Sequence, residues 1–492
     1  MKPLYYRPAH ELVADLRSGK LTSVEVTQAF IDRIRAVNSD INAVIALDEE
    51  QALAQARQAD EYLARGEHPG ALHGLPLTVK DTWEVAGMVC TAGAGALKNH
   101  RPQRNADVIE RLIGAGAIIL GRTNVPIYAT DVQSYNKLFG VTVNPYNPDH
   151  TPGGSSGGAA AATAAGMTPV EIGSDLGGSI RAPAHFCGVF GHKPSRSLVS
   201  FRGHIPGPPN TVSQPDLAEG GPLARTARDL ELMLKVIAGP RTLEARSWKL
   251  DLSGPLITNL KQARVGFWLE DPLCPVDHEM TAAYRALNGR LTDAGALVTP
   301  AKHELLNLAS IMPVYFNLMG SLLSTSLKPK QRRQLYWIAL LENLLKRFIP
   351  MTAGIGEYAR GTNQPIHQWI AQHEIREKMR VQIDELFKEH DVLLSPITPT
   401  AALKHDHSRP VARRRMQVNG QERPYFDQFC WIALATLLGL PATSVPIGRT
   451  KDGLPFSIQV IGAPGRDLTT IKFAELMESQ GLAGFRAPKD YT

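Results

Sequence analysis

Short apolar runs alternate with helix-forming segments along this chain, and this alternation restricts the fold more than any other feature. Runs of strand length occupy residues 77–80, 117–120, 265–268, 392–395, 444–447 and 457–461. Helical patterns occupy residues 22–37, 107–113, 159–165 and 226–237. Strands that alternate with helices pack as a sheet with helices on its faces. We therefore expect an α/β fold, in which a central mixed β-sheet is covered by helices on both faces.

Two of these helices carry signals at their ends. Thr22 and Glu25 have the spacing of a capping box, in which each side chain binds the other residue's backbone N–H. Thr226 is expected to cap the helix that stops before Gly239-Pro240, since glycine and proline commonly follow a last helical turn. These residues predict helix boundaries as well as helical structure.

The length of 492 residues allows two or three domains, or one large elaborated domain. Between about residues 300 and 425 helical stretches dominate, including 334–349 and 372–388, and loops that contain proline and glycine separate them. We interpret this region as an addition to the core. The expected organisation is one domain over residues 1–492, with a variable, mostly helical elaboration at about 300–425.

The charge balance argues against a nucleic-acid partner. The net charge is +6, and 20% of the residues are charged. Two tight basic clusters, at 328–333 and 413–415, lack interleaved aromatic residues that could stack on bases. We interpret both clusters as solvated surface and expect no nucleic-acid partner.

Other features limit the cofactors and the location. The four cysteines form no C-x-x-C pair, so neither a zinc site nor a redox motif is indicated. The first ten residues lack the apolar run of a signal peptide, and no stretch approaches 18 uncharged apolar residues. We expect a cytoplasmic protein with no metal, no cofactor and no membrane span.

Two glycine-serine segments are the main candidates for chemistry. Residues 151–158 read Thr-Pro-Gly-Gly-Ser-Ser-Gly-Gly, and residues 174–181 read Ser-Asp-Leu-Gly-Gly-Ser-Ile-Arg. Glycine lets a backbone approach a ligand closely, and a hydroxyl in such a loop can act as a nucleophile. The backbone N–H groups of 177–179 could converge on an oxyanion. The alternative is that both segments are structural loops without a catalytic role. Two glycine-serine loops in the same region disfavour this alternative.

The first segment also fits a second interpretation. Residues 153–157 satisfy G-x-S-x-G, the nucleophile elbow of α/β hydrolases, with Ser155 as the nucleophile. That mechanism needs a histidine later in the chain. The candidates are His367, His373, His390, His405 and His407. This interpretation leaves the second segment and Lys80 without a role.

Taken in order, the motifs resemble those of the amidase signature family. The resemblance rests on Gly74-Leu75-Pro76-Leu77-Thr78-Val79-Lys80-Asp81 and on segments 117–124, 144–147, 152–158, 175–183, 186–194, 439–442, 453–455 and 459–462. It is close from about residue 20 to 240 and from 430 to 465, and weak between them. One small departure is His192, where the family more often has leucine. The resemblance implies the amidase-signature fold.

The resemblance implies a Ser-cisSer-Lys triad. Ser179 would be the nucleophile, Ser155 the bridging serine after a cis peptide bond, and Lys80 the base. Lysine is a base only when neutral, and its unperturbed pKa is about 10.4, which burial in an apolar strand would lower. Asp81 should point away from Lys80, since neighbouring residues of a strand face opposite sides.

The resemblance also implies residues that support the triad. The backbone amides of Leu176, Gly177, Gly178 and Ser179 would form the oxyanion hole. Ser156 would support Ser155, and the family's acid–base pair beside the nucleophile would be Asp175 and Arg181.

Two functions follow from the resemblance. The leading one is a free-standing amidohydrolase that cleaves carboxylic amides, with esters or carbamates as further substrates, through a serine acyl-enzyme. The alternative is the glutaminase-type subunit of a tRNA-dependent amidotransferase. We recognise none of that subunit's further motifs between Arg196 and Tyr425. A third interpretation, a non-catalytic binding protein on the same scaffold, is disfavoured by the intact triad.

Apolar and aromatic side chains gather in the weakly matching middle of the chain. They include Met312, Tyr315, Phe316, Leu318, Met319, Tyr336, Trp337, Tyr425, Phe426, Phe429 and Trp431. Pockets lined in this way favour larger apolar groups. We expect a small-molecule amide substrate that is apolar or aryl, and we allow for a homodimer.

Overall fold

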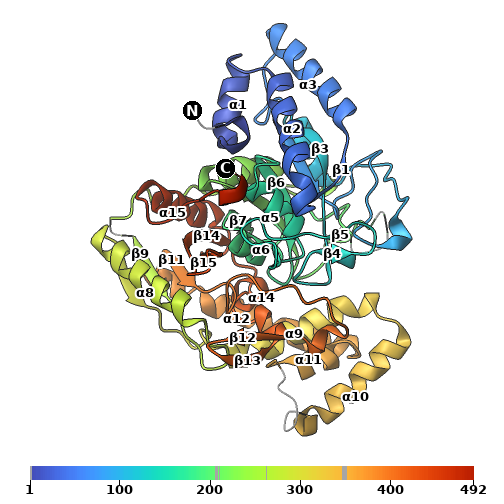
Figure 1. Ribbon diagram of the computed structural model, residues 1–492. Helices are drawn as coiled ribbons and strands as arrows, with labels where there is room; N and C mark the ends of the chain where they lie inside the picture. The colour runs from blue at the N-terminus through green and yellow to red at the C-terminus, as the bar shows by residue number, and fades with distance from the viewer. Residues whose placement is uncertain (1–2, 206–208, 210, 262, 346–351, 492) are drawn as a thin grey trace.

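The computed structural model describes residues 3–205, 209, 211–261, 263–345 and 352–491. Its centre is a mixed sheet with helices on both faces (Figure 1). In spatial order the described strands are β1 (Val44–Leu47), β3 (Ile118–Thr123), β2 (Pro76–Lys80), β6 (Val170–Asp175), β8 (Glu219–Ala224), β7 (Phe190–Lys193), β14 (Ala442–Arg449), β15 (Pro455–Ile461), β11 (Val392–Ser395), β9 (Arg264–Phe267) and β10 (Leu297–Pro300). The predicted α/β fold with a mixed sheet is confirmed.

The sheet joins two parallel groups of strands through an antiparallel centre. Strands β3, β2 and β6 run parallel to one another, and so do β11, β9 and β10. The pairs from β6 through β8, β7, β14 and β15 to β11 are antiparallel. Because neighbouring parallel strands end at the same edge of a sheet, the carboxyl ends of β2 and β6 lie together.

Helices surround this sheet. The longer ones are α1 (Ala9–Arg17), α2 (Ser23–Ile41), α3 (Glu49–Ala64), α4 (Asp107–Gly114), α5 (Gly157–Ala164), α7 (Ala227–Ile237), α8 (His278–Asp293), α9 (Leu308–Leu323), α10 (Pro329–Leu345), α12 (Ile366–Ile383) and α15 (Asp467–Ser479). The shorter ones are α6 (Arg181–Phe186), α11 (Ile355–Gly361), α13 (Leu386–Glu389) and α14 (Ala433–Leu437). Figure 1 shows α1 to α3 at one end of the molecule and α9 to α11 at the other.

Both capping predictions are confirmed. The Thr22 hydroxyl accepts a hydrogen bond from the backbone N–H of Glu25, and the Glu25 carboxylate accepts one from the backbone N–H of Thr22. Thr226 accepts from the backbone N–H of Asp229 at 3.2 Å and begins α7. Local hydrogen bonds therefore set both helix starts.

Several elements differ from the prediction; the strands β1, β7 and β10, for example, were not predicted. The helix predicted at 372–388 begins earlier, at Ile366, because Pro365 occupies its N-cap, and ends at Ile383 before the short α13. The helix predicted at 334–349 corresponds to α10, and residues 346–349 lie outside the described part of the chain. Strand β8 was not predicted, because its Gly-Gly-Pro run lacks the usual apolar side chains. It is buried between β6 and β7, where a Cβ on Gly221 would lie 2.1 Å from His192 O.

No membrane span was expected from the sequence, and one described helical segment meets the length and composition criteria for such a span. Within the described ranges, Leu308–Ser326 is the one helical segment long and apolar enough to cross a membrane. Its mean hydropathy is 1.2, and 56% of it is buried inside the structure. A core helix of a globular protein meets the same criteria.

Candidate active site

Three segments of the chain meet at the carboxyl ends of β2 and β6. Lys80 is the last residue of β2, and Asp175 is the last residue of β6. Ser155 and Ser156 directly precede α5, and Ser179 lies in the turn between β6 and α6. The parallel pairing of β2 with β6 thus brings together residues that are far apart in the sequence.

Lys80 is surrounded by three serine hydroxyls. Its Nζ lies 2.7 Å from Ser155 Oγ, 2.8 Å from Ser156 Oγ and 2.8 Å from Ser174 Oγ. All four residues are buried. The three N–H bonds of an ammonium group match these three oxygen atoms, so the charged form has a hydrogen-bond acceptor for each proton.

Burial lowers the pKa of Lys80 to about 7, although the negative charges of Asp175 and Glu171 act in the opposite direction. Glu171 lies on the neighbouring β6 and accepts hydrogen bonds from the hydroxyls of Thr78 and Thr123. Burial raises the pKa of Glu171 to about 8, so its charge is largely absent at pH 7. Lys80 can therefore be neutral near pH 7, as a general base must be.

Asp81 points away from Lys80, and this prediction is confirmed. One Asp81 carboxylate oxygen lies 3.1 Å from Arg122 Nη2 and accepts from the backbone N–H of Thr91 at 3.2 Å. Asp81 and Arg122 are both buried. The ion pair with Arg122 therefore holds the Asp81 carboxylate on the face of β2 opposite to Lys80.

The peptide bond between Gly154 and Ser155 is cis, as the resemblance implied. Gly154 packs against the backbone of residues 131–133, where a Cβ would lie 2.6 Å from Asp131 O. The backbone N–H of Ser156 donates to Ser179 O at 3.2 Å. The two glycine-serine segments are therefore in direct contact.

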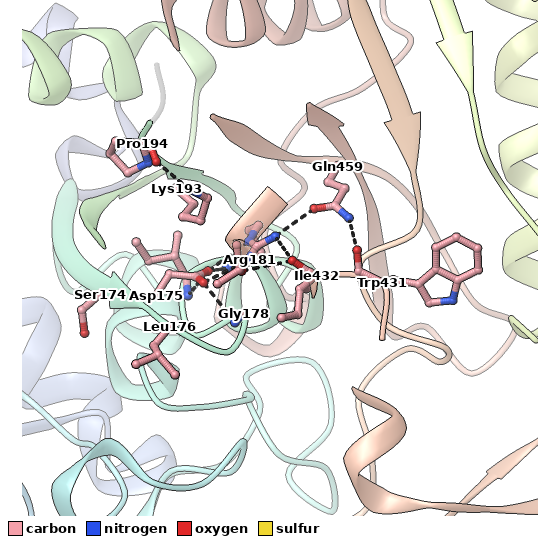
Figure 2. A network of polar contacts seen from close by, with 12 residues as sticks. Ser174, Asp175, Leu176, Gly178, Arg181, Lys193, Pro194, Trp431, Ile432 and Gln459 are labelled. Atoms are coloured by element: carbon pink, nitrogen blue, oxygen red, sulfur yellow. Dashed lines mark hydrogen bonds and ion pairs between the residues drawn. The ribbon is translucent and has the colours of Figure 1, made fainter. Parts of the chain in front are cut away.

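A buried ion pair organises the second segment (Figure 2). Arg181 Nη2 and Nε lie 2.9 Å and 3.1 Å from the two carboxylate oxygens of Asp175. The same carboxylate accepts hydrogen bonds from the backbone N–H groups of Gly178, Ile180 and Arg181. Burial alone would raise the pKa of Asp175, but the Arg181 charge and these hydrogen bonds hold it below its usual value. Asp175 therefore remains charged and shapes the turn that carries Ser179.

The implied oxyanion donors differ in their availability. The Gly178 amide donates to Asp175 Oδ1 at 3.0 Å and is already engaged. Within the described part of the chain, the amides of Leu176, Gly177 and Ser179 make no hydrogen bond. These three amides are the donors left for a developing oxyanion.

Arg181 also ties the second segment to the C-terminal part of the chain. Its Nη1 donates to Ile432 O at 3.1 Å and to Gln459 Oε1 at 3.2 Å (Figure 2). Gln459 Nε2 in turn donates to Trp431 O at 2.8 Å. Sequence reasoning did not single out Gln459 as a site residue, and its place in the motif 459–462 was the one available signal.

The aromatic side chains of the middle region do not form one pocket. The Phe429 ring packs on the second segment, since a Cβ on Gly177 would lie 2.6 Å from it. The Tyr315 hydroxyl donates to Leu176 O at 3.1 Å. Trp337, by contrast, is 56% exposed on α10. Clustering in the sequence therefore indicated a shared environment only in part, since ring contacts link Phe316 to Tyr315 and Phe429 but Trp337 lies apart on the surface.

The nucleophile-elbow interpretation lacks its histidine. Ser155 Oγ is hydrogen-bonded to Lys80, and within the described ranges no histidine is hydrogen-bonded to Ser155. Of the late histidines, His405 bonds to Pro148 O, and His407 stacks on Tyr135 at 4.0 Å between ring centroids. The base beside Ser155 is a lysine.

A cavity of about 260 Å³ lies elsewhere on the molecule. Its lining includes Tyr146, Arg290, Arg449 and Arg486. No residue of the candidate site lines this cavity, so the hollow is separate from the site around Lys80.

Known proteins resemble this chain along almost its whole length. A family model described as Amidase matches residues 25–471. The chain is 33% identical over 493 aligned residues to a glutamyl-tRNA(Gln) amidotransferase subunit of Carboxydothermus hydrogenoformans, with 96% of this chain and 97% of that protein covered. The subunit of the same name from Chloroflexus aggregans is 32% identical, with 96% of each chain covered. A solved bacterial aryl acylamidase of the amidase signature enzymes is 26% identical, with a TM-score of 0.78 and 97% of each chain covered.

These similarities correct the sequence-based prediction of partners. We expected a small-molecule amide substrate, apolar or aryl, and allowed for a homodimer, and from charge and composition we expected no nucleic-acid partner. That prediction is wrong, because relatives matched along almost the whole chain are named for a tRNA and as one subunit of an enzyme. Composition reports on charge and average polarity, and it does not identify the assembly to which a chain belongs.

Proposed function

The chain belongs to the amidase signature family, and from this premise we propose that it cleaves carboxylic amides through an acyl-enzyme on Ser179. Ser155 and Lys80 would move the proton. The amides of Leu176, Gly177 and Ser179 would stabilise the oxyanion.

The proposed reaction has two halves. Ser179 Oγ attacks the amide carbonyl carbon while its proton passes to Ser155 Oγ, and the Ser155 proton passes to Lys80 Nζ. The tetrahedral intermediate collapses when the proton returns through Ser155 to the amide nitrogen, the C–N bond breaks and the amine or ammonia leaves. Water then attacks the acyl-enzyme by the same proton route and releases the acid together with free Ser179.

One observation carries this proposal. A buried lysine with its pKa lowered to about 7 lies 2.7 Å from a serine hydroxyl. A lysine of ordinary pKa would be charged at neutral pH and could not accept a proton. A surface lysine would be solvated and would keep its ordinary pKa.

A second candidate concerns the setting in which the amide is cleaved. The curated relatives favour a glutaminase-type subunit of a tRNA-dependent amidotransferase over a free-standing hydrolase, because they are named as a glutamyl-tRNA(Gln) amidotransferase subunit and match 96% of the chain. In this setting the amide would be that of glutamine, and the released ammonia would be passed to a partner protein of the complex.

The chemistry is tested by active-site labelling. A fluorophosphonate should label Ser179, as mapped by peptide mass spectrometry, because that hydroxyl is the attacking group. Labelling of Ser155 or Ser156 instead would contradict the proposed roles.

The setting is tested by measuring ammonia release from L-glutamine. The assay uses the chain alone, and then the chain with the remaining subunits of a glutamyl-tRNA(Gln) amidotransferase and its tRNA. A strong increase in the complex supports the amidotransferase role. Turnover of simple amides by the chain alone, unchanged by the added components, supports a free-standing hydrolase.

A further inference from the structure

His204 lies one hydroxyl away from the base, although no motif pointed to it. Its Nε2 is 2.8 Å from Ser174 Oγ, and Ser174 Oγ is 2.8 Å from Lys80 Nζ. The His204 and Trp83 rings pack in a T-shape at 4.5 Å between centroids, and the Phe201 ring lies tilted by 37° against His204 at 4.2 Å. His204 is buried at 5% exposure, so these two rings hold the imidazole in place.

The imidazole is neutral wherever Lys80 titrates. Burial lowers the pKa of His204 well below its usual value, and the neighbouring Lys80 charge lowers it further. The other charged groups that act on Lys80 are Asp175 and Glu171, both on β6. A neutral imidazole has one N–H and one bare nitrogen. Within the described residues, Nδ1 is buried with no hydrogen-bond partner, and Nε2 is the nitrogen engaged with a hydroxyl. A bare Nε2 places the N–H at Nδ1, so the hydrogen bond from Ser174 must offset the cost of leaving that N–H without an acceptor.

The hydrogen bonds around neutral Lys80 can be accounted for one by one. A neutral amine has two N–H bonds and one lone pair, and three hydroxyls surround it. The Ser156 hydroxyl can donate to Ser174 O at 3.4 Å, and the Ser174 hydroxyl can donate to His204 Nε2. Both oxygen atoms then accept the N–H bonds of Lys80, and the lone pair remains for the hydroxyl proton of Ser155.

We propose that His204 is a positioning residue. Its Nε2 accepts a hydrogen bond from the Ser174 hydroxyl and thereby keeps the lone pair of neutral Lys80 directed at Ser155. Without this acceptor the Ser174 hydroxyl turns toward the lone pair and competes with Ser155. The inference rests on the proposed function, since it assigns His204 a role in the proton path of Lys80.

The matched variants are His204→Met and His204→Gln, which are similar in size and differ in the amide oxygen that glutamine offers as an acceptor. His204→Met should lower kcat about tenfold, the scale of one net hydrogen bond, with little change in KM. The acidic limb of the kcat/KM profile should move to lower pH by about half a unit, because the charged form of Lys80 loses a polarised acceptor. His204→Gln should keep most of the rate and the position of the limb.

Two controls separate positioning from folding. His185 is also buried, and its ring nitrogens bond to Thr400 O and to the backbone of Ser457. His185→Met should lower thermal stability without moving the acidic limb. In the background of Ser174→Ala, adding His204→Met should cause no further loss, since the intermediate hydroxyl is already gone.

The tautomer of His204 can be measured in the wild-type protein, so this test does not depend on whether a variant folds. Nitrogen NMR of the wild-type protein labelled at histidine should find His204 with a protonated Nδ1 and a bare Nε2 over the whole pH range of activity. A protonated Nε2 would overturn the proposal. Wild-type kcat and an unmoved limb in His204→Met would overturn it as well, and so would equal losses in the methionine and glutamine variants.

Other variants test the proposed function separately from the role of His204. If Ser179→Ala and Lys80→Met keep activity, then the triad assignment is wrong whatever His204 does. If those variants lose activity while His204→Met keeps the wild-type profile, then the triad stands and the role of His204 is refuted.

Discussion

Two regions of the molecule differ in the side chains that they bury and expose. One is the region around β2 and β6, and the other is the helical region from α9 to α12. Around β2 and β6 the ionisable side chains of Lys80, Asp175 and Arg181 are at most 1% exposed. On α10 and α12, large apolar side chains such as Trp337 and Ile370 are each 56% exposed. Buried polar groups are costly unless every one finds a partner. The first region is thus constrained to one geometry, which a reaction requires. In the second region the buried Arg376 of α12, paired with Asp216 at 2.7 Å, is under the same constraint, and the exposed faces of α10 and α12 are free of it.

The comparison predicts that single substitutions will have very different effects on stability and activity in the two regions. Changes around β2 and β6 should alter the chemistry or unbalance buried charges. Changes on the exposed faces of α10 and α12 should leave both stability and chemistry close to those of the wild type.

The largest effect should come from the nucleophile. Ser179→Ala removes the attacking oxygen, and we expect amide cleavage to fall by at least about a thousandfold. The thermal unfolding midpoint should change little, since the side chain is only half-buried. Steady-state kinetics and a thermal melt check this, and retained turnover would mean that the chemistry lies elsewhere.

Loss of the base should come next. Lys80→Met should lower kcat/KM by about 10² to 10⁴-fold, because no neutral amine then takes the Ser155 proton. In the wild type, kcat/KM should rise as pH increases through about 7, since the lowered pKa of Lys80 makes the neutral form dominant above that value. A pH–rate profile measured on both proteins checks the assignment, and a wild-type limb that survives in the variant would exclude Lys80 as its source.

The buried ion pair should dominate stability. Arg181→Met leaves the buried Asp175 without its ion-pair partner, and we expect a loss of about 3–5 kcal/mol in the free energy of unfolding. The matched control is Lys388→Met, which breaks an exposed pair with Glu385 and should cost far less, because water already screens that pair. Urea titrations compare the two, and similar losses would remove the distinction between the regions.

The smallest effect should come from the exposed face of α10. Trp337→Ala should change the free energy of unfolding by no more than about 0.5 kcal/mol. Its counterpart Trp431 is fully buried and packs on Trp268 at 5.0 Å between ring centroids, so Trp431→Ala should cost about 3–5 kcal/mol. A large loss for Trp337→Ala in the same titration would show that α10 is not independent of the core.

Much of the fold could be predicted from the sequence, because the signals involved are local. The capping box of α2 and the apolar runs of β2 and β11 depend on residues within one turn or one strand. Strand β8 escaped prediction because its Gly-Gly-Pro run becomes a strand only when β6 and β7 lie on either side. Propensity carries no information about such neighbours.

For the site, the sequence by itself determined which residue types are available, and its motifs in order indicated Lys80, Ser155 and Ser179. Only the tertiary structure decided that Ser174 and His204 join Lys80, and that Asp175 occupies the Gly178 amide. The physical reason is distance and burial. These contacts form between segments that meet only when the sheet assembles, and the lowered pKa of Lys80 exists only once water is excluded from its amine.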